Sequence, residues 1–243
     1  MKLNADLGES FGRWQSTTDA DVMPYIDQAN VACGYHAGDP KVLAHTIGLV
    51  KQYGVSLGAH PSYPDLQGFG RRSMRMPADE LIPLIHAQIA IVEGMAKCQH
   101  LALDYVKPHG ALYNDMMLYP QVYEDVVTAI SQYHAPLPLM IQALANNDFH
   151  IELAKKQGVT LLFEAFADRR YTANGYLMAR TNEGAVLDAD HALAQAKALI
   201  DDGCVIADDG KRIALRADTL CVHGDTPSAL SMLTQIRDYL DSR

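Results

Sequence analysis

The sequence is poor in positive charge, in cysteine and in long apolar runs. Lys and Arg total 20 against 29 Asp and Glu, for a formal net charge of -9. This balance disfavours binding to nucleic acid and docking on an anionic membrane, which both need clustered basic side chains. The four cysteines form no CxxC pair, so we expect reduced thiols. Asp6 and Glu9 interrupt the N-terminus where a signal peptide would be apolar, which favours a cytoplasmic protein.

The composition is that of a folded chain with a sizeable core. Hydrophobic residues make up 49% and charged residues 20% of the 243 positions, which excludes extended disorder. We find no internal repeat, no low-complexity tract and no Ser/Gly linker. One domain over residues 1–243 is therefore the expected organisation.

Short apolar segments alternate with amphipathic helices along the chain. The strands are predicted at residues 2–6, 28–33, 55–60, 104–107, 137–141, 160–164 and 219–223. Helix starts are predicted at Asp39-Pro40, Pro77, Pro120, Asp188 or Asp190, and Thr226-Pro227. Residues 204–215 predict a hairpin that turns at Asp209-Gly210.

About seven strands alternating with helices fit either an open doubly wound sheet or a (β/α) barrel. The first turn, residues 7–10, is no dinucleotide-binding fingerprint. Polar side chains instead follow nearly every predicted strand, and in a barrel such positions converge at one mouth. We therefore predict an α/β fold with a seven-stranded (β/α) barrel and a small hairpin before the last strand.

The residues that follow the strands carry the chemistry. They include four of the ten histidines, together with an ammonium group and two carboxylates: His36, His60, His109, His223, Lys107, Asp6 and Glu164. Such a set in one pocket suits proton transfer and stabilisation of an oxyanion. Taken singly, a histidine after a strand is more often structural, and Asp39 is more often a helix cap. The repetition of these groups at successive strand ends favours an active site.

The sequence raises two questions about cofactors, one about a metal ion and one about ATP. Asp6 with two of His36, His60 and His109 would suit zinc or manganese, although no HExxH motif fixes the geometry locally. We leave a divalent metal open. A phosphate loop needs GxxxxGK[ST], and neither Gly210-Lys211-Arg212 nor residues 68–73 match it. The chain therefore has no recognised ATP site of its own.

Six motifs in order resemble the LamB/YcsF family, known also as the A subunit of bacterial 5-oxoprolinase. They are NADLGES (4–10), NVACGYHAGDP (30–40), GAHPSYPD with GFGRR (58–65, 68–72), VKPHGALYN (106–114), FADRRY (166–171) and LCVHGDT (220–226). The resemblance implies a barrel of the glycoside hydrolase/deacetylase type. It also implies ATP-dependent opening of 5-oxo-L-proline to L-glutamate, performed with partner subunits B and C.

Within that hypothesis each residue receives a role. Asp6 or Glu164 would be the base for water, Lys107 would balance negative charge, and His60 or His109 would protonate the ring nitrogen. The substrate would be oriented by Asn30, His36, Arg169 and His223. Arg169 suits the substrate carboxylate through a forked contact. The alternatives are a metal-dependent amidohydrolase or deacetylase acting alone, and a non-catalytic subunit that binds the lactam.

Overall fold

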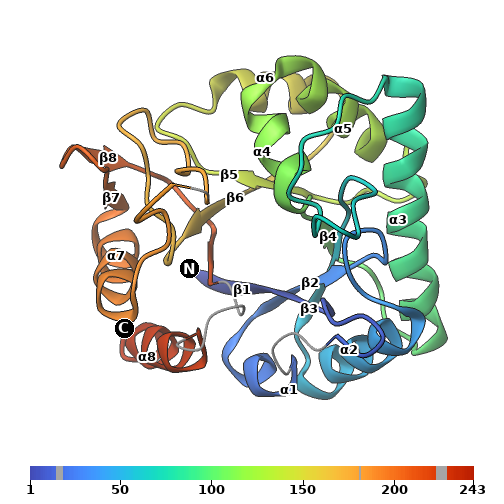
Figure 1. The fold of residues 1–243 in the computed structure, drawn as a ribbon, viewed down its shortest axis with the longest axis horizontal. Coiled ribbons are helices and arrows are strands. Elements are labelled where there is room, and N and C mark those ends of the chain that lie inside the picture. The colour runs from blue at the N-terminus through green and yellow to red at the C-terminus, as the bar shows by residue number, and fades with distance from the viewer. Residues whose placement is uncertain (15–18, 181, 223–228) are drawn as a thin grey trace.

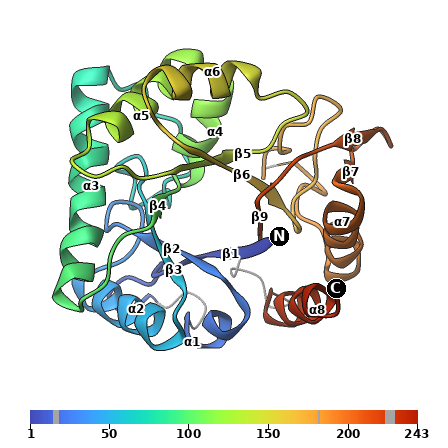
Figure 2. The same ribbon diagram turned by 180° about the vertical axis from the view of Figure 1, so that it is seen from behind.

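The computed structural model describes residues 1–14, 19–180, 182–222 and 229–243. Seven parallel strands close into a barrel in the order β1-β2-β3-β4-β5-β6-β9 (Figure 1 and Figure 2). Their bounds are Lys2–Leu7 (β1), Gln28–Ala32 (β2), Ser56–His60 (β3), Tyr105–Val106 (β4), Leu139–Gln142 (β5), Leu161–Phe166 (β6) and Thr219–Cys221 (β9). The predicted barrel is confirmed, with strand ends shifted by one or two residues.

Helices surround the barrel on its outside (Figure 2). They are α1 (Asp19–Val22), the 3-10 helix η1 (Met23–Tyr25), α2 (Pro40–Tyr53), α3 (Ala78–Cys98), α4 (Gly110–Leu118), α5 (Pro120–Gln132), α6 (Asp148–Lys156), α7 (Ala189–Asp202) and α8 (Ala229–Asp241). Asp39 caps α2 and Asp188 caps α7, as predicted. The predicted start of the last helix, Thr226-Pro227, lies outside the described residues. The sequence analysis missed α1, η1, α4 and α6.

A two-stranded hairpin precedes the last barrel strand. It pairs β7 (Cys204–Ile206) with β8 (Arg212–Ala214) in antiparallel register. Gly210 adopts a φ of 83° at its turn, a conformation that glycine reaches without steric penalty. The hairpin predicted from Asp209-Gly210 is confirmed.

The interior of the barrel is polar. Along β1 the side chains alternate, so that Asn4 and Asp6 point inward while the apolar residues between them join the outer core. A Cβ on Gly58 would lie 2.3 Å from the ring of Tyr105, its partner on β4. The missing side chain thus makes room for Tyr105, whose hydroxyl donates to Asn30 Oδ1 at 2.7 Å. Hydrogen-bonded polar side chains such as these therefore occupy the interior of the barrel.

Among the described residues, α3 is long and apolar enough to cross a membrane by length and composition alone. In this structure it packs against α2, α5 and β3. Its buried residues include Leu81, Ile85, Ile89 and Val92, which form one stripe toward the core. The packing is that of an outer barrel helix. All four cysteines are free thiols, as expected.

Candidate active site

A cavity of about 310 Å³ lies at the carboxyl ends of the barrel strands. Five of the residues expected from the sequence line it: Asp6, His60, Lys107, His109 and Arg169. Three more are fully buried beside them: Asn30, His36 and Glu164. His223 lies outside the described residues. Residues far apart in the chain thus meet around one space of the size of a small-molecule site.

Lys107 is the electrostatic centre of the site. Its ammonium group lies 2.9 Å from Asp6 Oδ1 and 2.7 Å from Glu164 Oε1, and its side chain is 3% exposed. Burial opposes the charge, but the two carboxylates outweigh it and raise the pKa of Lys107 well above its usual value. Lys107 therefore carries a positive charge at neutral pH.

A chain of hydrogen bonds among side chains inside the barrel holds Asp6 in place beside Lys107. The Asn30 side-chain amide donates to Asp6 Oδ1 at 2.9 Å and to Asn4 Oδ1 at 2.8 Å, while Asn4 donates to Thr219 Oγ1 at 3.0 Å. These contacts orient Asp6 without adding a charge. Asn30 therefore acts on Asp6 and is not among the cavity-lining residues described.

Glu164 is also not among the described residues that line the cavity. Its carboxylate is fully buried, where it contacts Lys107 and accepts a hydrogen bond from the Tyr113 hydroxyl at 2.8 Å. Tyr113 itself lines the cavity. Of the two carboxylates expected as a base, Asp6 is the one placed against the cavity.

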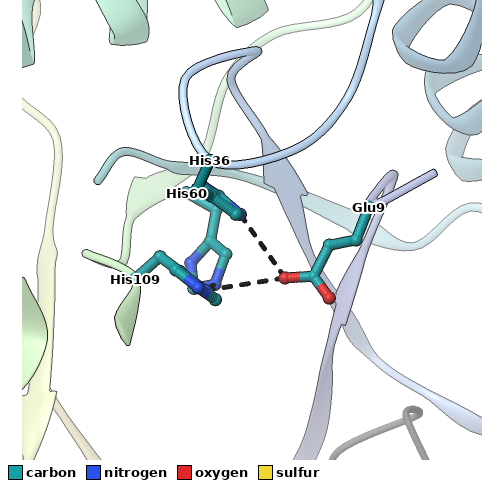
Figure 3. A group of neighbouring side chains, drawn as sticks. All are labelled: Glu9, His36, His60 and His109. Atoms are coloured by element: carbon teal, nitrogen blue, oxygen red, sulfur yellow. Dashed lines mark hydrogen bonds and ion pairs between the residues drawn. The ribbon is translucent and has the colours of Figure 1, made fainter. Parts of the chain in front are cut away.

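Three histidines and one carboxylate form a compact group at the cavity wall (Figure 3). The rings of His36 and His109 stack at 3.8 Å, and His109 Nδ1 lies 2.9 Å from His60 Nε2. Glu9 Oε1 lies 3.4 Å from His36 Nε2 and 3.5 Å from His109 Nδ1. One ligand atom from each residue lies within 4.8 Å of all the others, so the group could hold a metal ion. Its carboxylate is Glu9, whereas the sequence analysis proposed Asp6.

The surroundings of two of these histidines, His36 and His109, disfavour a positive charge on the ring. Burial holds the pKa of His36 and of His109 well below its usual range, and neighbouring imidazoles lower it further. His60 also lies 3.3 Å from Asp6 through its Nε2 and Asp6 Oδ2. The group thus joins the Lys107 centre through His60 and Asp6.

The GFGRR segment forms the cover over this histidine group. Gly70 adopts a φ of 65°, and a Cβ there would lie 2.8 Å from His109 Cδ2 and 2.9 Å from His36 Cβ. Phe69 has a φ of 55°, an uncommon conformation for a residue with a side chain. Asp65 anchors the segment by accepting hydrogen bonds from the Gly68 amide at 2.9 Å and Arg72 Nε at 3.0 Å. The strained backbone conformation of Phe69 therefore lies in the segment that contacts the histidines.

A second part of the cavity wall is cationic. Arg169, Arg71 and Arg180 all line the cavity. Arg169 is 6% exposed, and one of its terminal nitrogens donates to the Met178 carbonyl at 2.6 Å. Its Nε is buried with no hydrogen-bond partner among the described residues. Burial lowers the pKa of Arg169 to about 10, so the guanidinium remains charged at neutral pH. This wall suits an anionic group of a ligand.

A model of the LamB/YcsF family matches residues 1–243. The chain belongs to the LamB/YcsF family. It is 50% identical over 242 residues to the 5-oxoprolinase A subunit of Vibrio cholerae, covering 99% of this chain and 98% of that protein. The second 5-oxoprolinase A subunit of Pseudomonas putida is also 50% identical, covering 99% and 94%. The crystal structure of a lactam utilization protein from Thermus thermophilus superposes with a TM-score of 0.89 at 35% identity, covering 99% and 96%.

The cavity-lining residues that the sequence analysis did not assign to the site include Glu9, Arg71, Tyr113 and Arg180. Glu9 had a usable signal, since it follows Asp6 by three residues at the end of the first strand. Arg71 stands in the GFGRR motif of the LamB/YcsF resemblance, and Tyr113 in VKPHGALYN. Arg180 stands in none of the six motifs, and only the folded chain shows that it reaches the cavity.

Proposed function

We propose that this LamB/YcsF chain is the cytoplasmic A subunit of an ATP-dependent 5-oxoprolinase. It would open 5-oxo-L-proline to L-glutamate together with subunits B and C. The names of its relatives support this assignment. The observation that carries it is the cavity itself, which is lined by carboxylates, histidines, an ammonium group and a buried guanidinium. The substrate has the matching parts, which are an amide to be attacked and one carboxylate.

The substrate carboxylate would bind at Arg169. The buried Arg169 Nε supplies a donor that the described residues leave unsatisfied, and leaving such a donor unpaired is unfavourable. A carboxylate there would form a charge-assisted hydrogen bond. The lactam ring would then extend toward Asp6, Lys107 and the histidines that line the same cavity.

ATP is needed because a five-membered lactam is a resonance-stabilised amide and a poor electrophile. In the proposed first step, the lactam oxygen attacks the γ-phosphorus of ATP, which forms a phosphorylated cyclic imidate and ADP. Because the chain carries no phosphate loop, we assign ATP binding to subunits B and C. This chain would hold the lactam and direct the water.

Water then adds to the activated carbon. Asp6 would accept the proton of that water, and Lys107 would stabilise negative charge on the phosphoryl group. The tetrahedral product can expel phosphate, which regenerates the lactam, or it can break the ring C–N bond. A proton on the ring nitrogen selects C–N cleavage and gives an acyl phosphate, which a second water hydrolyses to glutamate and phosphate. We assign that proton to Asp6, which carries it after accepting it from the water and which lines the cavity. His60 and His109, expected from the sequence to supply it, instead place an N–H against the backbone carbonyls of Lys107 and Phe69.

The test is one assay of glutamate and ADP formation from 5-oxoproline. It compares this chain alone, subunits B and C alone, and all three together. The proposal expects activity only with all three, and a fall of roughly 10²–10⁴-fold in kcat when Asp6→Asn replaces the wild-type chain. Hydrolysis by this chain alone without ATP would make it an independent amidohydrolase. Full activity with Asp6→Asn and Lys107→Met would make it a non-catalytic binding subunit.

A further inference from the structure

We propose that Glu9, His36, His60 and His109 form a binding site for one divalent transition-metal ion of the zinc class. The site comprises three imidazole nitrogens and one carboxylate oxygen that converge at the cavity wall (Figure 3). This inference goes beyond the proposed function and does not depend on it, because metal binding is measured on the isolated chain. It rests on where the imidazole protons must lie and on the distances between the inward-facing atoms.

The outward nitrogens of two histidines face backbone carbonyls. His60 Nδ1 lies 2.7 Å from the Lys107 carbonyl oxygen, and His109 Nε2 lies 2.9 Å from the Phe69 carbonyl oxygen. A carbonyl oxygen only accepts, so each of these nitrogens carries the proton. In the neutral rings, His60 Nε2 and His109 Nδ1 therefore both present lone pairs, although they lie only 2.9 Å apart.

The third histidine, His36, also carries its proton on the nitrogen that points away from the group. His36 Nδ1 lies 3.0 Å from Ser62 Oγ, and the Ser62 hydroxyl donates its own hydrogen to the Tyr63 carbonyl at 2.8 Å. Ser62 Oγ must therefore accept from His36 Nδ1, which leaves a lone pair on His36 Nε2. That nitrogen is fully buried, has no hydrogen-bond partner among the described residues and faces Glu9 Oε1 at 3.4 Å.

Three lone pairs and a carboxylate oxygen thus face one another in a buried space. A proton on one imidazole would bridge a single pair of these atoms and leave the others in mutual repulsion. A divalent cation at their centre interacts favourably with all four. Each outward N–H bond also holds its ring in the tautomer that a metal requires, as outer hydrogen bonds do in metal sites.

Two of the spacings between the inward atoms agree with a small tetrahedral ion, and the four atoms all lie within 4.8 Å of one another. Ligands about 2.0–2.1 Å from zinc in a tetrahedron lie about 3.3–3.4 Å from one another. The two contacts of Glu9 Oε1 measure 3.4 and 3.5 Å, and the contact between His60 and His109 measures 2.9 Å. Three imidazoles favour zinc-like ions over magnesium or calcium, which prefer oxygen ligands. We therefore expect Zn²⁺ to bind and Mg²⁺ not to compete.

The experiment uses the full chain without an affinity tag, stripped with a chelator and titrated with Zn²⁺ by calorimetry, with elemental analysis after gel filtration. We expect one Zn²⁺ per chain in the wild type and an affinity at least about 10-fold lower in Glu9→Gln and in His36→Asn. The matched control is His191→Gln, which removes an exposed histidine on α7 beside Asp188. This control is expected to bind Zn²⁺ as the wild type does.

Zinc binding that survives in Glu9→Gln and His36→Asn but falls in His191→Gln would place the ion on the surface and overturn the proposal. So would a wild type that retains no Zn²⁺. Circular dichroism shows whether the variants fold. If the variants do not fold, X-ray absorption spectroscopy of the zinc-loaded wild type provides the test. The proposal expects scattering from three imidazole ligands, and scattering from fewer than three would refute it. No outcome depends on 5-oxoproline turnover, so the metal site and the proposed function can fail separately.

Discussion

Replacing Lys107 with methionine gives the sharpest test of the electrostatic centre. Methionine keeps the length and apolar stem of the side chain but removes the charge that lies between Asp6 and Glu164. Both carboxylates are at most 9% exposed in their side chains, so solvent would compensate only in part for the lost ammonium group. The variant would therefore leave two buried negative charges facing each other.

The size of the effect follows from the geometry. A unit-charge pair at about 2.9 Å attracts by about 6 kcal/mol at an effective dielectric constant of about 20, but desolvation of both ions offsets much of this. Breaking a buried pair by removing one partner typically destabilises by about 3–5 kcal/mol, and we expect Lys107→Met to fall in this range. Because the pKa of Lys107 is raised on folding, its contribution is complete below the unfolded pKa of about 10.4. The contribution is lost as pH rises through the higher folded pKa.

The assay is urea denaturation of wild type and variant at pH 7, 9 and 11. The difference in unfolding free energy should be equal at pH 7 and 9 and smaller at pH 11. Lys97→Met is the control, because Lys97 is 61% exposed and its ion pair with Glu93 is worth at most about 1 kcal/mol. The double variant Lys107→Met with Glu164→Gln should recover part of the loss. A loss below about 1 kcal/mol in Lys107→Met would refute the buried centre.

Three further predictions concern other parts of the molecule. In the assembled enzyme, Arg169→Gln should raise KM for 5-oxoproline about 10- to 150-fold, since a hydrogen bond to a charged group is worth about 1.5–3 kcal/mol. Gly70→Ala should lower the unfolding free energy by about 1–3 kcal/mol, as its methyl group would lie within 2.9 Å of His36 and His109. Burial raises the pKa of Glu93, but hydrogen bonds lower it to about 2, so Glu93→Gln should destabilise by about 1 kcal/mol at pH 7 and by less at pH 3 in urea denaturation.

Each of these has a control and a contrary result. Arg169→Lys keeps the charge and should lose less affinity than Arg169→Gln, whereas equal KM in wild type and Arg169→Gln would exclude Arg169 from the substrate. Gly54→Ala has a similar φ of 68° but an open surrounding, so it measures backbone strain alone. Equal losses in Gly54→Ala and Gly70→Ala would rule out contact with the histidines. A Glu93→Gln deficit that grows from pH 7 to pH 3 would contradict the lowered pKa.

The barrel and much of the site were predictable because their signals are local. Strand ends carry polar residues in sequence, so Asp6, His60 and Lys107 were identified without knowledge of their contacts. Helix α4 was missed because residues on nearly all its sides are buried, which removes the amphipathic stripe that marks a helix in the sequence. The site residue Tyr113 was missed with it.

Pairings between distant residues were beyond the reach of the sequence. Nothing in the spacing of Lys107 and Glu164 shows that they form an ion pair, or that Glu164 lies outside the cavity. The choice of Glu9 over Asp6 in the histidine group depends on a few ångströms set by the turn after β1 and by the Gly68–Arg72 cover. Such distances follow from the closed barrel and not from any one motif.

Closure of the ring between β1 and β9 has a consequence for synthesis of the chain. Lys2 pairs with Thr219, and Asn4 also donates to the Thr219 hydroxyl, across more than two hundred residues. During translation, the first strand therefore waits with one edge open until the last strand has left the ribosome, and contacts of such long separation form slowly. A truncated product ending before Thr219 would expose edges on both β1 and β6, which makes premature termination a route to aggregation.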